Sequence, residues 1–456
     1  MHYSLECLDT GTEISDAALP LTNPTARTPA LLRTRYHNRA FSPGSPELGI
    51  YRFADWLPIR RRLQGSSAPV TFRSEELGRH LGLSRLFITF SGYWPERGTR
   101  MLTGTFKECE AFSVCARMPA DHPDTLVVAS AGNTARAFIR VCSENGIPLV
   151  VVAPERNLPA LWAVGPLAEC VRLIAAGGDS DYADAIALSE MIAGLPGFTA
   201  EGGARNVARR DGMGTTMLSA VEAIGELPHH YFQAVGSGTG AIAAWEANLR
   251  FIDNGNFGRR KTRLHVSQNA PFTPIHDAWQ QRSRRFGPID EHTARSQIAA
   301  INARVLANRN PPYGIKGGLY DALVDTDGTT AAITNEAAAE ASRLFERLEG
   351  IDLEPAAAVA AAHLAEAARV GTVKADDAIV LNVTGGGYNR VHRDAEVAPV
   401  PPSLIIERRD FTPAAVAAAM APFSPVLSPS EKDQPRKNQS AKDSSKGNST
   451  TTVVPA

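Results

Sequence analysis

Short apolar segments alternate with helix-length segments along most of this chain, and this alternation constrains the fold more than any other feature. Residues 125–130, 149–153 and 171–175 have the β-branched, apolar composition of buried strands, and residues 134–144 have the composition of a helix that ends at Gly146. Strands of this kind, alternating with helices, predict βαβ units and a parallel sheet.

The alternation returns in the second half of the chain, which predicts a second lobe. Strands are expected at 230–235, 263–266 and 378–383, with a helix starting at Ala241. Two further helices are expected. One spans 336–348, with Asn335 as its N-cap and Gly350 just beyond its end, and the other spans 356–370. The predicted class is therefore α/β, with two open lobes.

Three turns that follow predicted strands combine glycines with small polar residues. They span residues 130–134, 236–240 and 383–387. Ligands of open α/β sheets lie at the carboxyl ends of strands, so we expect these turns to border one cleft. Each turn alone is also explained as a helix cap or a flexible connection.

The 236–240 turn has three alternate glycines, which let the backbone approach an anion, and Ser237 and Thr239 add hydroxyl donors. It predicts a phosphate site. With Ala241 it also matches the dinucleotide-binding pattern G-x-G-x-x-[GA], so a nucleotide-binding module is an alternative. Against that alternative, the next predicted strand ends near Ser267 and Gln268, without the acidic residue that contacts a ribose.

A lysine precedes these turns in the segment T-G-T-F-K, which ends at Lys107. Glycine and small polar neighbours let a lysine lie against a ligand, and a lysine amine forms Schiff bases with carbonyl compounds, pyridoxal phosphate among them. An ordinary solvated lysine is the alternative for Lys107 considered alone.

Composition excludes several classes of protein. The net charge of −1 lacks the basic excess of a protein that binds nucleic-acid phosphates. The five cysteines form no C-x-x-C pair, which indicates a reducing compartment and no metal site. No leader or membrane-length apolar stretch is found, so a cytoplasmic protein is expected. Residues 424–456 are rich in Ser, Pro, Lys and Asp, and are expected to be disordered.

The lysine and the three turns, in this order, resemble the fold-type II pyridoxal-phosphate enzymes, which include threonine synthase and cysteine synthase. The resemblance covers residues 70–387 and includes an E-P-A segment at 354–356. It implies that Lys107 holds pyridoxal 5'-phosphate, that Asn133 contacts the pyridine 3-hydroxyl and that Thr384 contacts the ring nitrogen. It also implies that the glycine turn binds the cofactor phosphate through Gly236, Ser237, Gly238, Thr239 and Gly240.

Within that group the chain is most similar to the threonine synthase family. Tyr3, Leu5 and Cys7 match its zinc-ribbon-like start, but Thr10 replaces the second cysteine and a later cysteine pair is missing, so no zinc is expected. Lys107 is followed by E-C-E instead of the family's D-R-G. This departure resembles the branch of the family in methanogenic archaea that makes L-cysteate from O-phospho-L-serine and sulfite, for coenzyme M biosynthesis. Threonine synthesis from O-phospho-L-homoserine is the alternative.

The resemblance also implies a domain division and a substrate site. It places a degenerate ribbon at 1–60, a large cofactor-binding lobe at 61–110 and 216–423, and a smaller mobile lobe at 111–215. It also implies a homo-oligomeric enzyme, as is usual in the family. Substrate contacts are expected from Ser130, Gly132, Thr134 and Arg100. Arg97 and Lys316 are further candidates for the positive charge that anionic substrates require.

Overall fold

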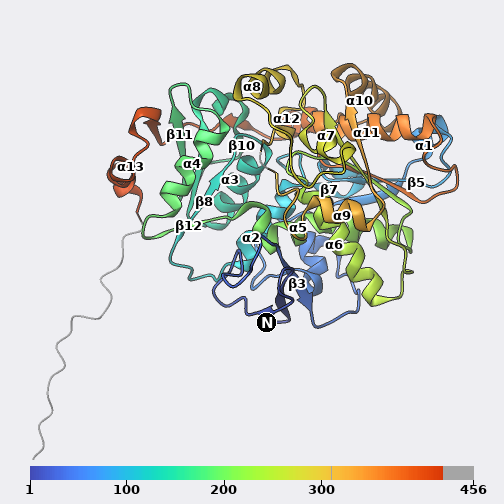
Figure 1. The fold of residues 1–456 in the computed structure, drawn as a ribbon, viewed down its shortest axis with the longest axis horizontal. Helices are drawn as coiled ribbons and strands as arrows, with labels where there is room; N and C mark the ends of the chain where they lie inside the picture. The colour runs from blue at the N-terminus through green and yellow to red at the C-terminus, as the bar shows by residue number, and fades with distance from the viewer. Residues whose placement is uncertain (310, 425–456) are drawn as a thin grey trace, which may run out of the picture. The chain divides into compact units, whose positions relative to one another are not determined.

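The computed structural model describes residues 1–309 and 311–424. Its larger sheet has six strands in the order β15-β14-β13-β16-β5-β4, parallel except for the β4–β5 pair (Figure 1). The strands are β4 (Val70–Arg73), β5 (Leu86–Phe90), β13 (His230–Ala234), β14 (Arg263–Asn269), β15 (Thr329–Ile333) and β16 (Ile379–Val383). The predicted strands at 230–235, 263–266 and 378–383 are therefore confirmed.

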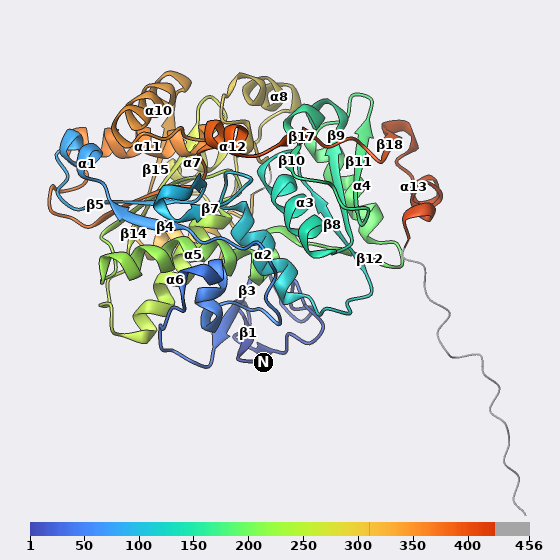
Figure 2. The same ribbon diagram turned by 180° about the vertical axis from the view of Figure 1, so that it is seen from behind.

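Helices cover both faces of this sheet, which is why its strands are apolar on both sides (Figures 1 and 2). The helix α7 (Pro274–Gln280) lies beside β15, and its buried residues Ile275 and Trp279 pack in the same cluster as Leu319. One face of the sheet carries α1 (Glu75–Leu81), α10 (Asn335–Glu349) and α11 (Pro355–Arg369). The other carries α5 (Val207–Ile224), α6 (Thr239–Asn254) and α9 (Leu319–Asp325).

The expected helix at 336–348 is present as α10, but its predicted N-cap is wrong by one residue. Thr334 is the N-cap, and its side chain accepts a hydrogen bond from the Ala337 N–H at 3.2 Å. The Asn335 amide instead joins α10 to the preceding loop: it accepts from the Asn302 N–H and donates to the Ala300 carbonyl. Gly350 ends the helix in the left-handed conformation, as expected.

The second sheet has five parallel strands in the order β12-β8-β9-β11-β18. Its strands are β8 (Thr125–Ala129), β9 (Leu149–Pro154), β11 (Val171–Gly177), β12 (Phe198–Ala200) and β18 (Leu404–Glu407), and its helices include α3 (Asn133–Asn145) and α4 (Tyr182–Ala193). The strands expected at 125–130, 149–153 and 171–175 correspond to β8, β9 and β11.

The position of β18 departs from the expected division of the chain, which assigns the smaller lobe to residues 111–215 alone. The chain returns after the large sheet and adds β18 along the free edge of β11, from Ile174–Leu404 to Gly177–Glu407. The helix α13 (Pro413–Met420) follows and packs on α4. A four-residue edge strand far along the chain carries no local signal of the sheet that it joins.

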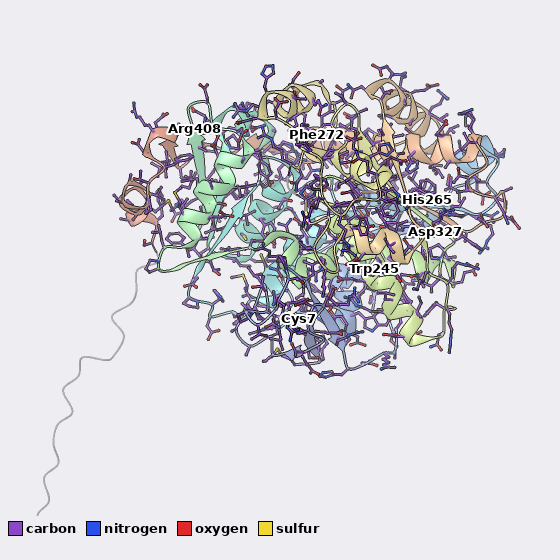
Figure 3. All side chains as sticks on the ribbon, in the orientation of Figure 1. Cys7, Trp245, His265, Phe272, Asp327 and Arg408 are labelled. Carbon is purple, nitrogen blue, oxygen red and sulfur yellow. The ribbon has the colours of Figure 1, made fainter. Side chains whose placement is uncertain are left out.

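The N-terminal residues form a small antiparallel sheet of β1 (Tyr3–Cys7), β2 (Glu13–Ile14) and β3 (Leu32–Tyr36), with Cys7 at the end of β1 (Figure 3). Burial raises the pKa of the Cys7 thiol, but hydrogen bonds from Thr10 and Asn23 outweigh it and lower the pKa. Polar side chains thus surround Cys7 in the segment where a zinc ribbon would place further cysteines. Among residues 1–309 and 311–424, no group of three or more His, Cys, Asp or Glu side chains is arranged to hold a metal.

The shorter elements include α2 (Lys107–Arg117), α8 (Glu291–Ala300), α12 (Tyr388–Asp394), β6 (Tyr93–Trp94), β7 (Thr99–Arg100), β10 (Trp162–Val164) and β17 (Val397–Pro399). No helix within the described part of the chain is both long and apolar enough to cross a membrane. The tail for which disorder is expected lies, from residue 425 on, outside the described residues.

Candidate active site

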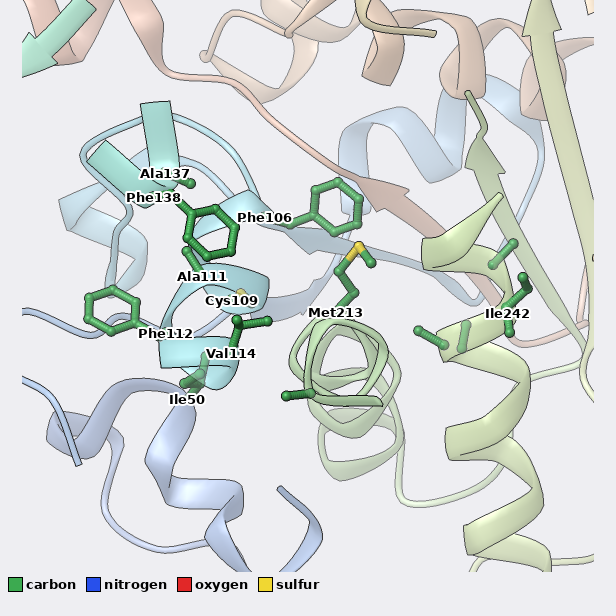
Figure 4. Packing of buried hydrophobic residues seen from close by; sticks show 14 of the residues in the cluster. Ile50, Phe106, Cys109, Ala111, Phe112, Val114, Ala137, Phe138, Met213 and Ile242 are labelled. Atoms are coloured by element: carbon green, nitrogen blue, oxygen red, sulfur yellow. The ribbon is translucent and has the colours of Figure 1, made fainter. Parts of the chain in front are cut away.

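Lys107 is the first residue of α2, a helix that packs between α3 and α5 (Figure 4). The loop before it lies directly on the 383–387 turn: the Phe106 N–H donates to the Thr384 carbonyl at 2.9 Å, and the Gly386 N–H donates to the Gly104 carbonyl at 2.9 Å. Two of the predicted motifs are therefore joined through their backbones. Glu108, fully buried, fixes the loop further, because it accepts from Thr103 and from Arg140.

The Lys107 amine is held by contacts within this site. Its Nζ lies 3.0 Å from Glu110 Oε2, 3.7 Å from the Met213 sulfur and 4.9 Å from the centre of the Phe106 ring. The side chain of Lys107 is 18% exposed and that of Glu110 is 0% exposed. Lys107 is thus not the freely solvated lysine that was its alternative.

Glu110 connects Lys107 to two other elements. Its Oε1 accepts a hydrogen bond from the Thr134 hydroxyl at 3.0 Å and lies 3.3 Å from Arg209 of α5. Arg209 also pairs with Glu201. Burial works against the charge on Arg209, but the carboxylates of Glu110 and Glu201 outweigh it and raise the pKa of Arg209. Lys107, Glu110, Arg209 and Glu201 are called the Lys107 cluster below.

Sequence reasoning missed Glu110 and Arg209. Glu110 had a usable signal, because a residue three positions after Lys107 on a helix lies on the same face. No local pattern in the sequence indicates Arg209, because it is brought next to Glu110 only by the packing of α5 on α2.

The 130–134 turn begins α3, with Gly132 as N-cap and Asn133 as first residue. The Ser130 hydroxyl accepts from the N–H groups of Gly132 and Ala135, at 3.3 and 3.2 Å, so it shapes the turn itself. Asn133 Oδ1 accepts a hydrogen bond from Arg136, another residue that sequence reasoning missed. A Cβ at Gly132 would meet only the Val305 side chain, at 3.4 Å.

The 236–240 turn joins β13 to α6 and comes close to the lysine loop. A Cβ at Gly240 would lie 3.0 Å from the Phe106 ring, and one at Gly236 would lie 2.9 Å from Leu306 Cα. Gly238 has a φ of +76° and is the N-cap of α6, where a glycine has no side chain with which to cap the helix. The first N–H groups of this 16-residue helix therefore receive no cap from Gly238, and Ser237 and Thr239 are hydrogen-bonded to each other beside them at 2.7 Å.

Thr384 directly follows the last residue of β16 and is buried, at 6% exposed. The E-P-A segment lies against this turn: the Glu354 N–H donates to the Gly385 carbonyl at 3.0 Å, and the Glu354 carboxylate caps α11 by accepting from the Ala356 N–H. Burial raises the pKa of Glu354, and hydrogen bonds from Ala356 and Asn133 together with the charge of Arg136 partly offset that rise.

The three cations that the sequence suggests as sources of positive charge for the substrates make other contacts. Arg97 stacks on the rings of Phe72 and Trp94, with its guanidinium carbon 4.0 and 5.0 Å from their centres. Arg100 is in β7, where its N–H donates to Ser67. Lys316 is paired with Asp9, which follows the strand β1. Unlike these three cations, Arg209 belongs to the Lys107 cluster, where it lies 3.3 Å from Glu110.

These contacts bring all four motifs together and suit pyridoxal phosphate. The site offers a buried primary amine for the aldehyde, a glycine-lined helix N-terminus for the phosphate, and amide and hydroxyl groups for the edge of a polar ring. The close approach of Leu306 and Phe106 to Gly236 and Gly240 explains why the turn needs glycine at these positions.

Comparison with known proteins identifies the family. Residues 74–385 match the family model described as "Pyridoxal-phosphate dependent enzyme", which includes the 236–240 turn and does not favour a nucleotide-binding module. The chain is 49% identical over 409 residues to the cysteate synthase of Methanoregula boonei, covering 90% of this chain and 95% of that protein. It is 45% identical to the cysteate synthase of Methanosarcina barkeri, covering 90% and 98%.

Solved structures share the fold at low sequence identity. Threonine deaminase isoform 2 of Solanum lycopersicum superimposes with a TM-score of 0.53 and 15% identity, over 71% of this chain and 86% of that one. Maize serine racemase gives a TM-score of 0.53 and 15% identity, over 70% and 89%. The expected fold-type II architecture and its cofactor, pyridoxal phosphate, are therefore confirmed. This chain belongs to the pyridoxal-phosphate dependent enzymes and, among them, to the cysteate synthase family.

Proposed function

We propose that this enzyme converts O-phospho-L-serine and sulfite to L-cysteate and phosphate. The observation that carries the proposal is the position of the Lys107 amine. Through Glu110 it is linked to the 130–134 turn, and through Phe106 it adjoins the 236–240 turn. Similarity to cysteate synthases along about nine tenths of the chain supports the choice of reaction.

The proposed contacts with the cofactor follow the motifs. Lys107 holds its aldehyde carbon, Asn133 contacts its 3-hydroxyl and Thr384 contacts its ring nitrogen. The N–H groups and hydroxyls of the 236–240 turn bind its phosphate. When bound, the cofactor supplies an electron sink that stabilises negative charge at the substrate α-carbon.

In the proposed reaction, Lys107 acts a second time, as the base that removes the proton from the α-carbon of phosphoserine. The bond between the β-carbon and the phosphate oxygen breaks, and the phosphate leaves with the electron pair. The sulfur of sulfite then forms a bond to the same β-carbon, and Lys107 returns a proton to the α-carbon. A neutral hydroxyl at Thr384 would leave the ring nitrogen unprotonated, which favours elimination at the β-carbon over amino-group transfer.

The substrates of this proposal are small anions. The N–H groups of the 130–134 turn, at the start of α3, are placed to receive the substrate carboxylate, with Ser130, Gly132 and Thr134 forming the turn. Arg209, a member of the Lys107 cluster, supplies positive charge for these anions. The proposal also takes the enzyme to be a cytoplasmic homo-oligomer.

A purified-enzyme assay tests the reaction. Cysteate formed from phosphoserine and sulfite is the expected product, and threonine formed from phosphohomoserine instead would refute the proposal. An absorbance band at about 410–420 nm reports the lysine–cofactor bond. Lys107→Ala should abolish that band, whereas Lys374→Ala, at an exposed turn before β16, should keep it. A band retained in Lys107→Ala would refute the role of Lys107.

A further inference from the structure

Arg136 of α3 is a buried arginine that contacts Asn133, a residue of the proposed site, and Tyr388, which directly follows the 383–387 turn. It is 8% exposed overall. Its Nη2 donates to Asn133 Oδ1 and, at 2.9 Å, to the Tyr388 hydroxyl, and its Nη1 donates to the Ala160 carbonyl at 3.3 Å. An arginine needs a reason to be buried, because removing a guanidinium from water is costly unless it is paired.

Aromatic rings fix the position of this guanidinium. Its central carbon lies 4.6 Å from the centre of the Trp162 ring and 5.4 Å from that of Tyr388, and the two rings meet edge to face at 6.2 Å. Tyr388 is itself held by the lysine loop: a Cβ at Gly104 would lie 2.3 Å from its ring, so the ring packs directly on that glycine. Arg136 is therefore anchored to the loop that carries Lys107.

The contact with Arg136 decides which way the Asn133 amide faces. The oxygen and nitrogen of an asparagine side chain exchange places by a half turn, and the hydrogen-bond partners choose between the two orientations. A guanidinium only donates, so the atom of Asn133 that faces Arg136 must be the oxygen. The opposite side of the amide is then the NH₂ group, which is turned away from Arg136.

We infer that Arg136 is a positioning residue, which fixes the Asn133 amide so that its NH₂ group faces the 3-hydroxyl oxygen of bound pyridoxal phosphate. This inference rests on the proposed contact between Asn133 and the cofactor. The N–H groups of the amide, on the side away from Arg136, are then available to donate to that oxygen. Without Arg136 the amide is free to turn and present its oxygen, which repels an oxygen of the cofactor.

The affinity for pyridoxal phosphate, measured by titrating the cofactor-free protein, tests the inference without relying on turnover. Arg136→Met keeps an apolar chain between the rings and removes the donors. It should weaken cofactor binding about tenfold, equivalent to about 1.4 kcal/mol. Arg136→Lys keeps the charge but not the fork of donors, so it should not restore the affinity. Arg282→Met, which removes an exposed guanidinium stacked on Trp279, is the matched control and should bind as the wild type does.

A double-mutant cycle shows whether Arg136 acts through Asn133. Asn133→Ala should also weaken binding, and Arg136→Met should then have no further effect in the Asn133→Ala protein. Additive losses would overturn the inference and leave the cofactor role of Asn133 standing. An unchanged affinity in Asn133→Ala would overturn both. Retention of the absorbance band in Lys107→Ala would instead contradict the proposed role of Lys107, whatever the result for Arg136.

Chemical rescue separates a local effect from misfolding. Arg136→Ala leaves a cavity between Trp162 and Tyr388 of the shape of a guanidinium ion. Free guanidinium, added well below denaturing concentrations, should recover cofactor affinity in Arg136→Ala and have no such effect on Asn133→Ala. Absence of rescue in a variant with wild-type circular dichroism would count against Arg136 as the group that orients Asn133.

Discussion

The Lys107 amine and the Glu110 carboxylate form an ion pair at 3.0 Å within one turn of α2, and the carboxylate is fully buried. Glu110 also faces Arg209, so one carboxylate is shared by two cations. Removing a partner from a buried pair is costly, because the remaining charge loses its compensation.

Glu110→Gln should therefore lower the free energy of unfolding of the cofactor-free protein by about 3 kcal/mol. Urea denaturation of Glu110→Gln, Lys107→Met and the double variant measures the coupling between the two residues, which should be at least about 1 kcal/mol. Glu76→Gln, which breaks the exposed Glu76–Arg79 pair, should change stability by less than about 0.5 kcal/mol. Equal effects of the two glutamine variants would contradict this account of Glu110.

Acid should destabilise the folded protein through His363 and His265. Burial lowers the pKa of His363 to about 4, with a smaller contribution from His276. Burial also lowers the pKa of His265 to about 2, together with the charges of His230 and His363. An unfolded histidine takes up a proton near pH 6.5, so between that pH and the folded pKa the unfolded chain binds more protons and stability falls as the pH falls.

Each of these histidines should contribute a slope of up to about 1.4 kcal/mol per pH unit below pH 6.5. His363→Met should remove one such contribution between about pH 6 and pH 4.5. Its cost at neutral pH should be small, since His363 Nδ1 has no hydrogen-bond partner among the described residues. Urea midpoints at several pH values measure the slope, and an identical slope in His363→Met would disprove the assignment.

Asp181 should hold the start of α4 and also tie it to the segment around α8. Its carboxylate caps α4 by accepting from the Ala183 and Asp184 N–H groups, and it lies 2.9 Å from Arg309 and 3.5 Å from Arg295. Asp181→Asn keeps a good cap and loses the ion pairs, at an expected cost of about 1 kcal/mol. Asp181→Ala loses the cap as well and should cost about 1 kcal/mol more.

Chemical denaturation and limited proteolysis across 291–309 both report the Asp181 contacts. Cleavage there should be faster in both variants than in the wild type. If Asp181→Asn were as stable and as resistant as the wild type, the ion pairs would have no structural role.

Gly236→Ala should be destabilising for steric reasons. The new Cβ would lie 2.9 Å from Leu306 Cα and 3.1 Å from the Leu306 and Val305 carbonyl oxygens, and these backbone atoms cannot move aside alone. Overpacking of this kind costs about 1–3 kcal/mol. Gly194→Ala is the matched control, because its nearest atoms are at 3.5 Å and its φ is −80°. Thermal unfolding should separate the two, and equal midpoints would show that the 305–306 segment yields freely.

The parts of the site that depend only on neighbouring residues in the chain could be predicted from the sequence. Strand ends followed by glycine turns depend on the composition of a few neighbouring residues, so the turns beside Asn133, Gly238 and Thr384 could be predicted. The sequence could not decide between Thr334 and Asn335 as the N-cap of α10, because both residue types are favoured at that position. Arg209 could not be found in this way, since its contact with Glu110 depends on how α5 packs on α2. Arg136 lies three positions after Asn133 on one helix, so that contact had a local signal, but its contact with Tyr388 depends on the packing of α12.

The addition of β18 to the edge of β11 has a consequence for how the chain is made. Residues 171–177 emerge from the ribosome long before residues 404–407, so the N–H and C=O groups along that side of β11 stay unpaired for most of synthesis. An open strand edge is a template for pairing with another chain. Truncation before residue 404 should therefore yield a protein that aggregates, even though every residue proposed to contact the cofactor would be present.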